Sequence, residues 1–394
     1  MASAKVKWFG RGLSAVLNTG RLLISPAINF LLAYWVIKVA GQAAWGQFVD
    51  VLIFTSLSGM FLSFGIKEYV LRQASLNPNL LGGFVKSGIL TRLLLMVPVA
   101  AAAFIFFPIN QAGWLMLWLS SLLIGSGLDP ITNFNRSYAK AIVAELTFAL
   151  FLFGFLGTQT INQNTLIVAF SIAAFIRSLV LSVLFRNELN KGQTSFDLRL
   201  LAAGLPFLLM GFSGMLQAKT DLYLVSIMLD DDALAAYQVS INFFVYLQAL
   251  VGFILLPFAK NLYRAPKALI RKICFRSGVS GVLLLTVFLP IGYYILNSIY
   301  AFNLGVEVII LGGLYALPTF IFSPLVYKLL GTKQEKAVFR VTVFGLLVNV
   351  IFTYGLITQF GITGAFAGSM LSNWALLVGY LVVFRKTESA ATNS

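Results

Sequence analysis

The sequence predicts an all-α integral membrane protein of about twelve transmembrane helices, arranged as two six-helix lobes related by a pseudo-repeat. Of its 394 residues, 59% are hydrophobic and only 10% are charged, whereas a soluble globular domain carries about 25% charged residues. The apolar residues fall in runs of about 18 to 25, the length at which a helix spans a bilayer. Several runs are too long for the strands of a barrel, and strand-like alternation is missing, so helices are expected.

Each apolar run is interpreted as one span. We expect spans at residues 14–39, 46–66, 87–107, 112–134, 141–158, 165–185, 202–228, 234–258, 275–297, 303–326, 338–357 and 361–384. The first run follows a basic segment that is similar to the start of a signal peptide. It is long and has no clear cleavage site of small residues, so we interpret it as a retained first span.

The basic residues predict the orientation of the spans. They lie before the first span, in every second connection and after the last span, at Lys5, Lys7, Arg11, Lys67, Arg72, Lys86, Arg136, Lys140, Arg186, Lys191, Arg199, Lys260, Arg264, Lys267, Arg271, Lys272, Arg276, Lys328, Lys333, Lys336, Arg340, Arg385 and Lys386. Basic connections mark the cytoplasmic side of a membrane protein, so both termini are expected to be cytoplasmic. The net charge of +15 then reflects topology and contact with lipid headgroups, and no nucleic-acid partner is expected.

Several classes of function are disfavoured. The connections are too short for a soluble catalytic or nucleotide-binding domain, and no G-x-x-x-x-G-K-[ST] loop is found, so ATP hydrolysis is not expected. The chain has no histidine, the commonest metal ligand, and no metal site or other cofactor is predicted. A membrane-embedded enzyme of glycan assembly would need a sizeable outer loop, so we expect that the protein is not an enzyme.

The two halves of the chain are similar in layout. Three pairs of residues share an offset of 192 positions: Pro98 with Pro290, Trp45 with Tyr237, and Asn29 with Asp221. Such an offset is typical of parallel repeats with a substrate site between them. We therefore expect an N-terminal lobe at residues 1–194, with helices 1–6, and a C-terminal lobe at residues 195–394, with helices 7–12.

Two stretches carry a family resemblance. Residues 25–73, "SPAINFLLAYWVIKVAGQAAWGQFVDVLIFTSLSGMFLSFGIKEYVLRQ", resemble the opening of bacterial polysaccharide transporters. Residues 200–262, "LLAAGLPFLLMGFSGMLQAKTDLYLVSIMLDDDALAAYQVSINFFVYLQALVGFILLPFAKNL", resemble the start of their second half. The shared pattern is a helix with a proline, a buried Asp, a short loop, an aromatic residue that opens the next helix, and a terminal proline. These transporters are lipid-linked oligosaccharide flippases, of the O-antigen type, within the multidrug/oligosaccharidyl-lipid/polysaccharide exporter superfamily.

The resemblance implies a function. It implies alternating access in the bacterial inner membrane, with an oligosaccharide on an undecaprenyl diphosphate carrier as substrate, membrane lipids as surroundings, and a glycan polymerase and chain-length regulator as further partners. A cation-coupled multidrug exporter of the same superfamily is an alternative, although such a protein favours carboxylates over the basic residues seen here. A peptidoglycan-precursor flippase is another, although members of that group usually carry more spans.

Polar residues recur at helical spacing within five of the expected spans. The stripes are Asn18–Arg21–Ser25–Asn29, Ser126–Asp129–Asn133–Arg136, Ser213–Gln217–Asp221, Gln238–Asn242–Tyr246 and Gly345–Asn349–Thr353. Spacings of three and four place each stripe on one helical face. One interpretation is a hydrated cavity lined by Asn18, Ser25, Asn29, Gln217, Asn242 and Asn349, which can bind sugar hydroxyls. The other is hydrogen bonding between helices, which is common in membrane bundles.

Four cations within the spans are candidates for binding the diphosphate. Arg21, Arg92 and Arg177 are expected in the cytoplasmic half, where a long side chain can also snorkel to the headgroups. Arginine suits phosphate because its planar fork pairs with two oxygens. Lys219 lies far from both expected ends of its span, so it either pairs across helices or contacts phosphate in mid-membrane.

Two carboxylates are candidates for ion coupling, with a proton or sodium as the coupled ion. Asp221 is two positions from Lys219, so the two side chains point roughly 200° apart on a regular helix and are not expected to pair. Because Asp221 follows the Ser213–Gln217 stripe, we expect it to face the cavity. There it would bind a coupling ion or neutralise a cation of another helix. Glu145 lies near Lys140, so a salt bridge at the membrane rim is the alternative to coupling for this residue.

Overall fold

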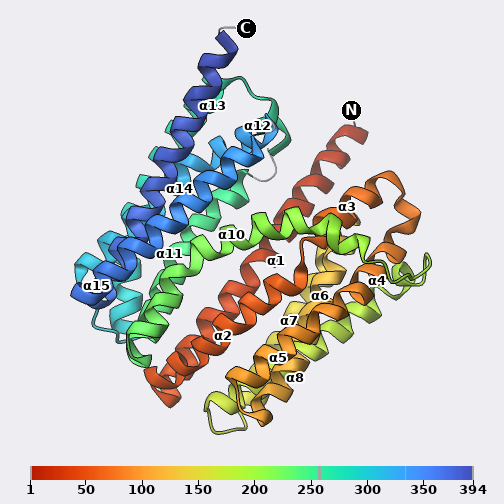
Figure 1. Cartoon of the computed structure of the whole chain (residues 1–394), viewed down its shortest axis with the longest axis horizontal. Coiled ribbons are helices and arrows are strands. Elements are labelled where there is room, and N and C mark those ends of the chain that lie inside the picture. The colour runs from red at the N-terminus through yellow and green to blue at the C-terminus, as the bar shows by residue number, and fades with distance from the viewer. Residues whose placement is uncertain (1, 256–258, 333, 393–394) are drawn as a thin grey trace. The chain divides into compact units, whose positions relative to one another are not determined.

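The computed structural model describes residues 2–255, 259–332 and 334–392. Within these residues the chain is almost entirely helical and forms no strand (Figure 1). Eleven helices in the described chain are long and apolar enough to cross a membrane, and the last of them is two helices joined at a break. The chain is therefore a multi-pass, all-α membrane protein, as the sequence predicts. The side chains of Lys5, Lys7, Arg11, Lys260 and Lys333 lie outside the described residues.

The chain divides into two compact units. The first comprises Met1–Ala40 and Gln47–Phe212, and the second comprises Gly41–Gly46 and Ser213–Ser394. The first half of helix α10 (Arg199–Met228) packs within the first unit, so the units follow packing and do not coincide with the halves of the sequence. The lobes at 1–194 and 195–394 stay a prediction about the repeat.

The first unit is built from helices that pack around two apolar clusters. Its elements are α1 (Ala2–Ala40), α2 (Gln42–Ser63), α3 (Ile66–Leu76), η1 (Pro78–Leu80), α4 (Leu81–Arg92), η2 (Leu93–Leu95), α5 (Met96–Phe106), α6 (Ile109–Phe134), α7 (Tyr138–Leu156), α8 (Gln163–Leu184) and α9 (Arg186–Leu189). The cluster around Val85 and Ile131 joins α3, α4, α6 and α8, and the cluster around Leu62 and Leu119 joins α2, α5 and α6.

Local sequence explains the breaks between these elements. The third expected span is interrupted by the 3-10 turn η2. Pro98 has no backbone N–H, so the carbonyl group one turn earlier in the helix has no helical hydrogen-bond donor. The second expected span ends early, since Phe64 and Gly65 both adopt left-handed φ angles of 47° and 63°. Gly65 is required there, because a Cβ atom would lie 2.5 Å from the Cβ of Phe207 in α10.

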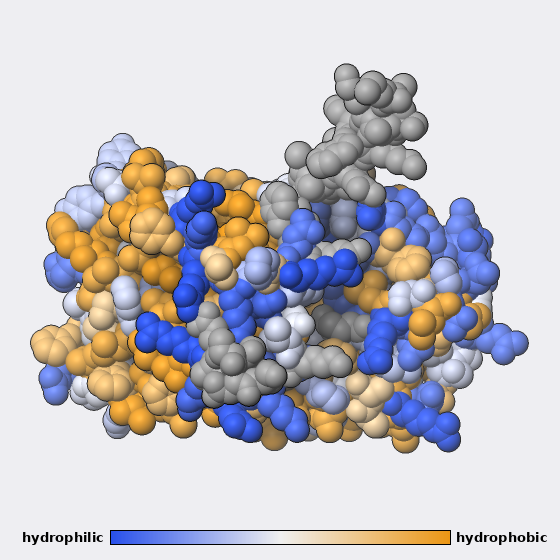
Figure 2. Space-filling view, turned by 90° about the horizontal axis from the view of Figure 1, so that it is seen from above, coloured by the Kyte–Doolittle hydropathy of each residue, from blue (hydrophilic) through white to orange (hydrophobic). Residues whose placement is uncertain are grey.

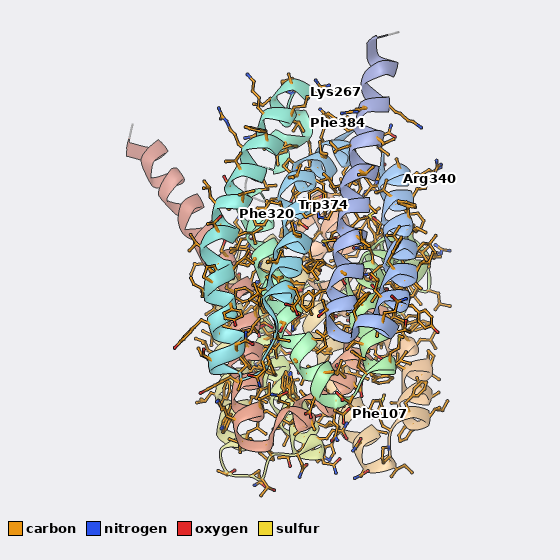
Figure 3. All side chains as sticks on the ribbon, turned by 90° about the vertical axis from the view of Figure 1, so that its left-hand side faces the viewer. Phe107, Lys267, Phe320, Arg340, Trp374 and Phe384 are labelled. Atoms are coloured by element: carbon orange, nitrogen blue, oxygen red, sulfur yellow. The ribbon has the colours of Figure 1, made fainter. Side chains whose placement is uncertain are left out.

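The second unit consists of the remaining helices. They are the latter half of α10, α11 (Asp231–Leu255), α12 (Ala259–Arg264), α13 (Lys267–Tyr294), the π-helical turn η4 (Ile295–Ile299), α14 (Val306–Gly331) and α15 (Glu335–Thr392). Ile270, Leu325 and Tyr380 lie in a buried apolar cluster that joins α13, α14 and α15. Figure 3 shows Lys267, Arg340 and Phe384 toward one end of this unit, with Phe320 and Trp374 further along the helices.

Helix α15 is a hairpin of two helices. Gly361 interrupts it with a φ of 54° and a ψ of −129°, outside the helical region. Three contacts join the two arms: Thr342 with Tyr380, Gly345 with Ser372, and Thr353 with Gly368. Since residues further before Gly361 pair with residues further after it, the arms run antiparallel. They account for the eleventh and twelfth expected spans.

Gly368 allows the two arms to approach closely, which gives a first testable prediction. A Cβ atom at this position would lie 2.5 Å from the Cα of Thr353, so Gly368→Ala forces the arms apart. We expect a loss of about 1–3 kcal/mol in the free energy of unfolding, measured as a lower unfolding temperature in detergent. Gly355→Ala is the matched control, because nothing lies within 4 Å of its added Cβ. Equal stability of the two variants would contradict the close packing.

The molecular surface combines apolar and polar areas. On the face drawn in Figure 2, hydrophilic and hydrophobic residues are interspersed. Many large apolar side chains are exposed along the helices, for example Ile105, Leu150 and Phe275. In a soluble protein such exposure is a liability, whereas lipid chains solvate it without penalty.

Candidate functional site

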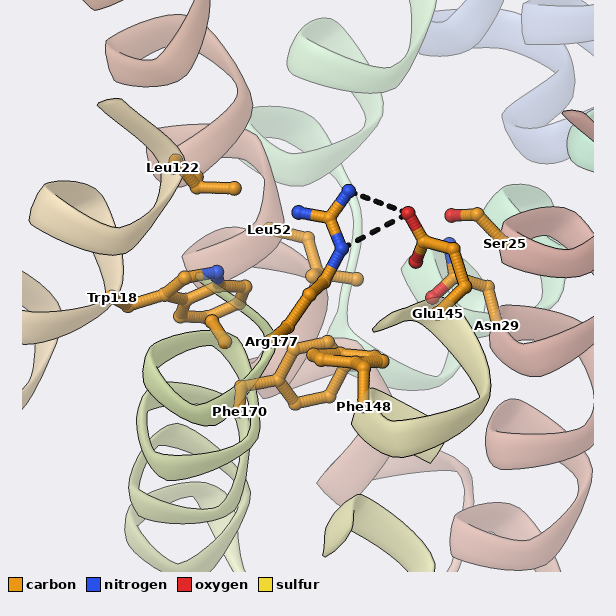
Figure 4. A pocket seen from close by; sticks show the side chains of 10 residues that line it. Ser25, Asn29, Leu52, Trp118, Leu122, Glu145, Phe148, Phe170 and Arg177 are labelled. Carbon is orange, nitrogen blue, oxygen red and sulfur yellow. Dashed lines mark hydrogen bonds and ion pairs between the residues drawn. The ribbon is translucent and has the colours of Figure 1, made fainter. Parts of the chain in front are cut away.

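A pocket within the first unit collects polar residues from α1, α7 and α8. Its volume is about 260 Å³. The lining comprises Ser25, Asn29, Leu52, Trp118, Leu122, Glu145, Phe148, Phe170, Ala174 and Arg177, drawn in Figure 4. The polar face of α1, predicted from spacing alone, therefore contributes Ser25 and Asn29 to a single hollow with two of the candidate charged residues.

Glu145 and Arg177 form an ion pair across this pocket. The Nε and Nη2 atoms of Arg177 both donate to Oε1 of Glu145, the first over 2.9 Å. The alternative of a salt bridge at the membrane rim between Glu145 and Lys140 is wrong. The two residues are five positions apart, so they point to different sides of α7, and Lys140 pairs instead with Glu188.

Several polar atoms around the pocket have no partner within the described residues. No hydrogen bond is found there for the side chains of Ser25 and Asn29, for the indole N–H of Trp118, for Nη1 of Arg177 or for Oε2 of Glu145. Ser25 contrasts with neighbouring helical serines such as Ser121 and Ser171, whose hydroxyls donate to a carbonyl of their own helix. The pocket therefore offers free donors and acceptors.

One wall of the pocket is aromatic. The rings of Trp118 and Phe170 lie with their centroids 4.8 Å apart, and Phe148 meets Phe170 edge-on at 5.7 Å. Such an aromatic pair buries a large apolar area. The site therefore combines an apolar wall with a polar rim, as ligand pockets commonly do.

A basic cluster lies one turn along α1 from the pocket. Asp129 of α6 is 3.4 Å from Nη1 of Arg21 and 3.5 Å from Nζ of Lys67. The Arg21 guanidinium also lies over the ring of Tyr138, 6.0 Å from its centroid. Two cations share one carboxylate, so the cluster carries a net positive charge. Asn18, one turn before Arg21 on α1, is partly buried.

Arg92 is separate from the pocket. It is 2% exposed, and its guanidinium donates to five acceptors: the carbonyls of Gly88, Leu62, Ser63 and Leu123, and the hydroxyl of Ser126. Four of these acceptors lie on α2 and α6, and Leu62 and Ser63 end α2. This bonding leaves the guanidinium no free face for a substrate, so Arg92 stabilises the junction of three helices.

Asp221 lies in a buried network of the second unit. It is 2% exposed, and its Oδ2 accepts hydrogen bonds from the hydroxyl groups of Tyr237 (2.5 Å) and Ser369 (2.7 Å). The expectation that Asp221 faces a cavity is therefore wrong for the described structure. Its carboxylate points into the packing between α10, α11 and α15, because two hydroxyl groups there supply the hydrogen bonds that burial of a charge requires.

The other polar candidates of this unit lie close to the same network. The Nζ atom of Lys219 is 3.4 Å from Oδ1 of Asn242, and no ion pair of Lys219 is found among the described residues. Asn349 donates to the backbone carbonyl of Gln217 over 3.0 Å, and the amide of Gln217 is 3.4 Å from the hydroxyl of Ser372. These stripes therefore hydrogen-bond between helices, which was one of the two interpretations of the pattern.

Sequence reasoning missed several of these partners. Lys67 was assigned only to topology, and the aromatic wall gave no signal, since Trp and Phe are common throughout the chain. Tyr237 was marked only by its offset of 192 from Trp45. No group of three or more His, Cys, Asp or Glu side chains that can hold a metal ion is found in the described part of the chain.

Comparison with known proteins places the fold. No family model matches the sequence, and no curated protein matches it. Similar solved structures include an inward-facing multidrug resistance MATE family transporter of the MOP superfamily, with a TM-score of 0.67 and 15% identity, covering 96% of this chain and 99% of that one. The lipid II flippase MurJ, in an inward closed conformation, aligns with a TM-score of 0.69 and 14% identity over 94% of this chain and 87% of that one. A mutant of the Vibrio cholerae MATE transporter VcmN has a TM-score of 0.62 and 15% identity, with 98% of each chain covered. The chain therefore has the fold of the MATE and MurJ membrane transporters.

Proposed function

We propose that the protein is a flippase that moves an undecaprenyl-diphosphate-linked oligosaccharide from the cytoplasmic to the outer leaflet of the bacterial inner membrane by alternating access. In this proposal both termini are cytoplasmic, and a glycan polymerase and a chain-length regulator use the product. The similarity of fold to a lipid II flippase supports transport of a lipid-linked substrate. The resemblance of residues 25–73 and 200–262 to polysaccharide transporters supports a glycan headgroup.

The observation that carries the proposal is the layout of the polar face of α1. This face joins the basic cluster to the pocket, since Arg21 lies four positions before Ser25 and eight before Asn29. At 1.5 Å per residue these steps are about 6 and 12 Å along the helix. A diphosphate bound near Arg21 and Lys67 would therefore direct its first sugar toward the polar pocket. Of the four predicted cations, Arg21 is the one we retain as a diphosphate contact.

The alternative of a multidrug exporter rests on the MATE neighbours. Export of organic cations favours unpaired carboxylates in the binding site. In the first unit Glu145 is neutralised by Arg177, and Asp129 is outnumbered by Arg21 and Lys67. The charge of the site therefore favours an anionic substrate over a cationic one.

For ion coupling we propose Asp221. It is a carboxylate held by hydroxyl groups with no cation in direct contact within the described residues, so its charge is free to be neutralised by a proton or a sodium ion. Glu145 is the weaker candidate, because Arg177 already neutralises it.

Reconstitution tests the function. We would place the purified protein in liposomes that contain a fluorescent undecaprenyl-diphosphate oligosaccharide, and follow the loss of outer-leaflet fluorescence after chemical bleaching. The expected result is a rate of flipping above that of liposomes without the protein, and no uptake of a fluorescent organic cation. Cation uptake without flipping would favour the exporter, and flipping of lipid II alone would favour the peptidoglycan precursor.

The basic cluster gives a second prediction. Arg21→Gln and Lys67→Gln each remove one charged donor to phosphate, and a hydrogen bond to a charged group contributes about 1.5–3 kcal/mol. We expect at least about tenfold slower flipping for Arg21→Gln, and a smaller loss for Lys67→Gln because Lys67 is more exposed. Arg72→Gln, an exposed change on α3, is the control. Wild-type rates for both cluster variants would exclude this cluster as the diphosphate site.

A further inference from the structure

We propose that the pocket between α1, α6, α7 and α8 binds one uncharged sugar ring, the ring attached directly to the diphosphate. The inference rests on the proposed function and adds to it a substrate preference: the protein selects lipid-linked glycans whose first sugar is neutral. Four features of the pocket carry it.

The first feature is charge. The charged residues of the lining are Glu145 and Arg177, and they neutralise one another. A negatively charged sugar would compete with Glu145 for Arg177, and a positively charged one would compete with Arg177 for Glu145. Either ligand would have to separate the pair, and breaking a largely buried ion pair is strongly unfavourable. A neutral ligand can bind without disturbing it.

The second feature is the set of unpaired polar atoms. Within the described part of the chain, Nη1 of Arg177, the amide of Asn29 and the indole N–H of Trp118 are free donors. Oε2 of Glu145 and the side-chain oxygens of Ser25 and Asn29 are free acceptors there. A hydroxyl group donates one hydrogen bond and accepts up to two. A ring that carries several hydroxyl groups therefore matches a lining that mixes donors with acceptors.

The third feature is the aromatic wall formed by Trp118, Phe170 and Phe148. A pyranose ring has a face of C–H groups between its polar edges. Such a face packs on an aromatic surface while the hydroxyl groups point to the rim, an arrangement that suits a pocket of mainly apolar lining with a few placed polar groups.

The fourth feature is size. Pockets for drug-sized ligands measure roughly 300–1,000 Å³, and this one is slightly smaller, at about 260 Å³. It can hold one sugar ring and its substituents but not a whole oligosaccharide. Since Ser25 lies one helical turn from Arg21, the ring in the pocket is the one next to the diphosphate, and later sugars lie outside.

The test compares three lipids in reconstituted liposomes: a polyprenyl diphosphate without sugar, one with a neutral hexose and one with a hexuronic acid as first sugar. Wild-type protein is expected to flip the hexose lipid about tenfold faster than the hexuronate lipid.

Two variants test the polar atoms of the pocket. Asn29→Leu keeps the volume of the side chain and Trp118→Phe keeps an aromatic ring, but both remove polar atoms. We expect each variant to flip the hexose lipid several-fold more slowly than wild-type protein and to flip the sugarless lipid at the wild-type rate. Trp114→Phe, on the same helix but outside this pocket, is the control.

A charge change provides the sharper result. Glu145→Gln leaves Arg177 positive in the pocket, so the transport preference should shift from the hexose lipid toward the hexuronate lipid. If this variant fails to fold, the Asn29→Leu and Trp118→Phe variants test the inference. The inference is overturned if wild-type protein flips the hexose and hexuronate lipids equally, or if the pocket variants slow the sugarless lipid as much as the hexose lipid. Failure of wild-type protein to flip any of the lipids would instead overturn the proposed function itself.

Discussion

Replacing Arg92 by Met is expected to prevent stable folding of the first unit. The side chain is almost fully buried, and its guanidinium donates to carbonyls of α2, α4 and α6 and to Ser126. Met has similar length but no donor, so the carbonyls of Leu62 and Ser63, at the end of α2, lose their partner. Each unsatisfied buried group costs about 1–3 kcal/mol, and several are created at once. We expect a loss of more than about 4 kcal/mol, an exceptional value for one substitution and a large share of the roughly 5–15 kcal/mol by which native proteins are stable.

The measurement is the yield and unfolding temperature of the purified variant in detergent. Arg186→Met is the matched control, since Arg186 is exposed on α9 and its replacement should have little effect. Arg92→Lys keeps the charge but has one ammonium group in place of the planar guanidinium. Its stability should therefore lie between those of the wild-type protein and Arg92→Met. A folded Arg92→Met protein with reduced flipping would show that this residue acts on substrate and not on packing.

Asp221→Ala is expected to have the second largest effect, on both stability and transport. The hydroxyl groups of Tyr237 and Ser369 lose their acceptor, and both are buried. These two hydroxyl oxygens lie 3.2 Å apart, so one can then donate to the other, and the donor that stays unsatisfied costs about 1–3 kcal/mol. Asp221→Asn keeps the shape of the side chain and removes its charge, so it should retain more stability while losing the ion-binding function.

The transport measurement compares flipping with and without an imposed proton or sodium gradient across the liposome membrane. Wild-type protein should respond to one of the two gradients, and Asp221→Asn should respond to neither. The control is Asp232→Asn, which alters an exposed carboxylate at the start of α11. A gradient response that persists in Asp221→Asn would exclude Asp221 as the coupling residue.

The number and kind of helices followed from simple physics. Apolar runs of membrane-spanning length need internal hydrogen bonding in lipid, and only helices supply it in runs of this length. Helix bounds were less predictable where the backbone changes conformation. The left-handed pair Phe64–Gly65 ends α2 within its expected span, and α3 begins directly after it; Phe64 is not a residue that signals such a turn.

The site was predicted in part. Helical spacing placed Ser25 and Asn29 on one face, and both line the pocket with Glu145 and Arg177. Spacing within one helix cannot show which residue of another helix lies opposite. For that reason Lys140, on the same helix, was the partner considered for Glu145 in the alternative to ion coupling, although its partner Arg177 is 32 positions away. The same limit applies to Asp221, whose orientation depends on Tyr237 and on Ser369, 148 positions further along the chain.

Depth in the membrane was also a weak guide to role. Arg21 and Arg92 were both expected in the same half of the bilayer, yet one lies in a partly open charged cluster and the other bonds to backbone carbonyls. The difference arises from the break after Ser63, which exposes carbonyls that need a donor. Nothing in the local sequence around Arg92 indicates that break.

If the proposed function holds, the shared carboxylate of Asp129 would have a consequence for turnover. Because Arg21 and Lys67 already hold an anion, an arriving phosphate would replace one contact with another of the same kind. The net gain would be only the difference between two similar attractions, so the headgroup would be held briefly and released readily. Asp129 would then act as an internal competitor that returns to the two cations once the substrate has left, which suits a carrier that must release its substrate as efficiently as it binds it.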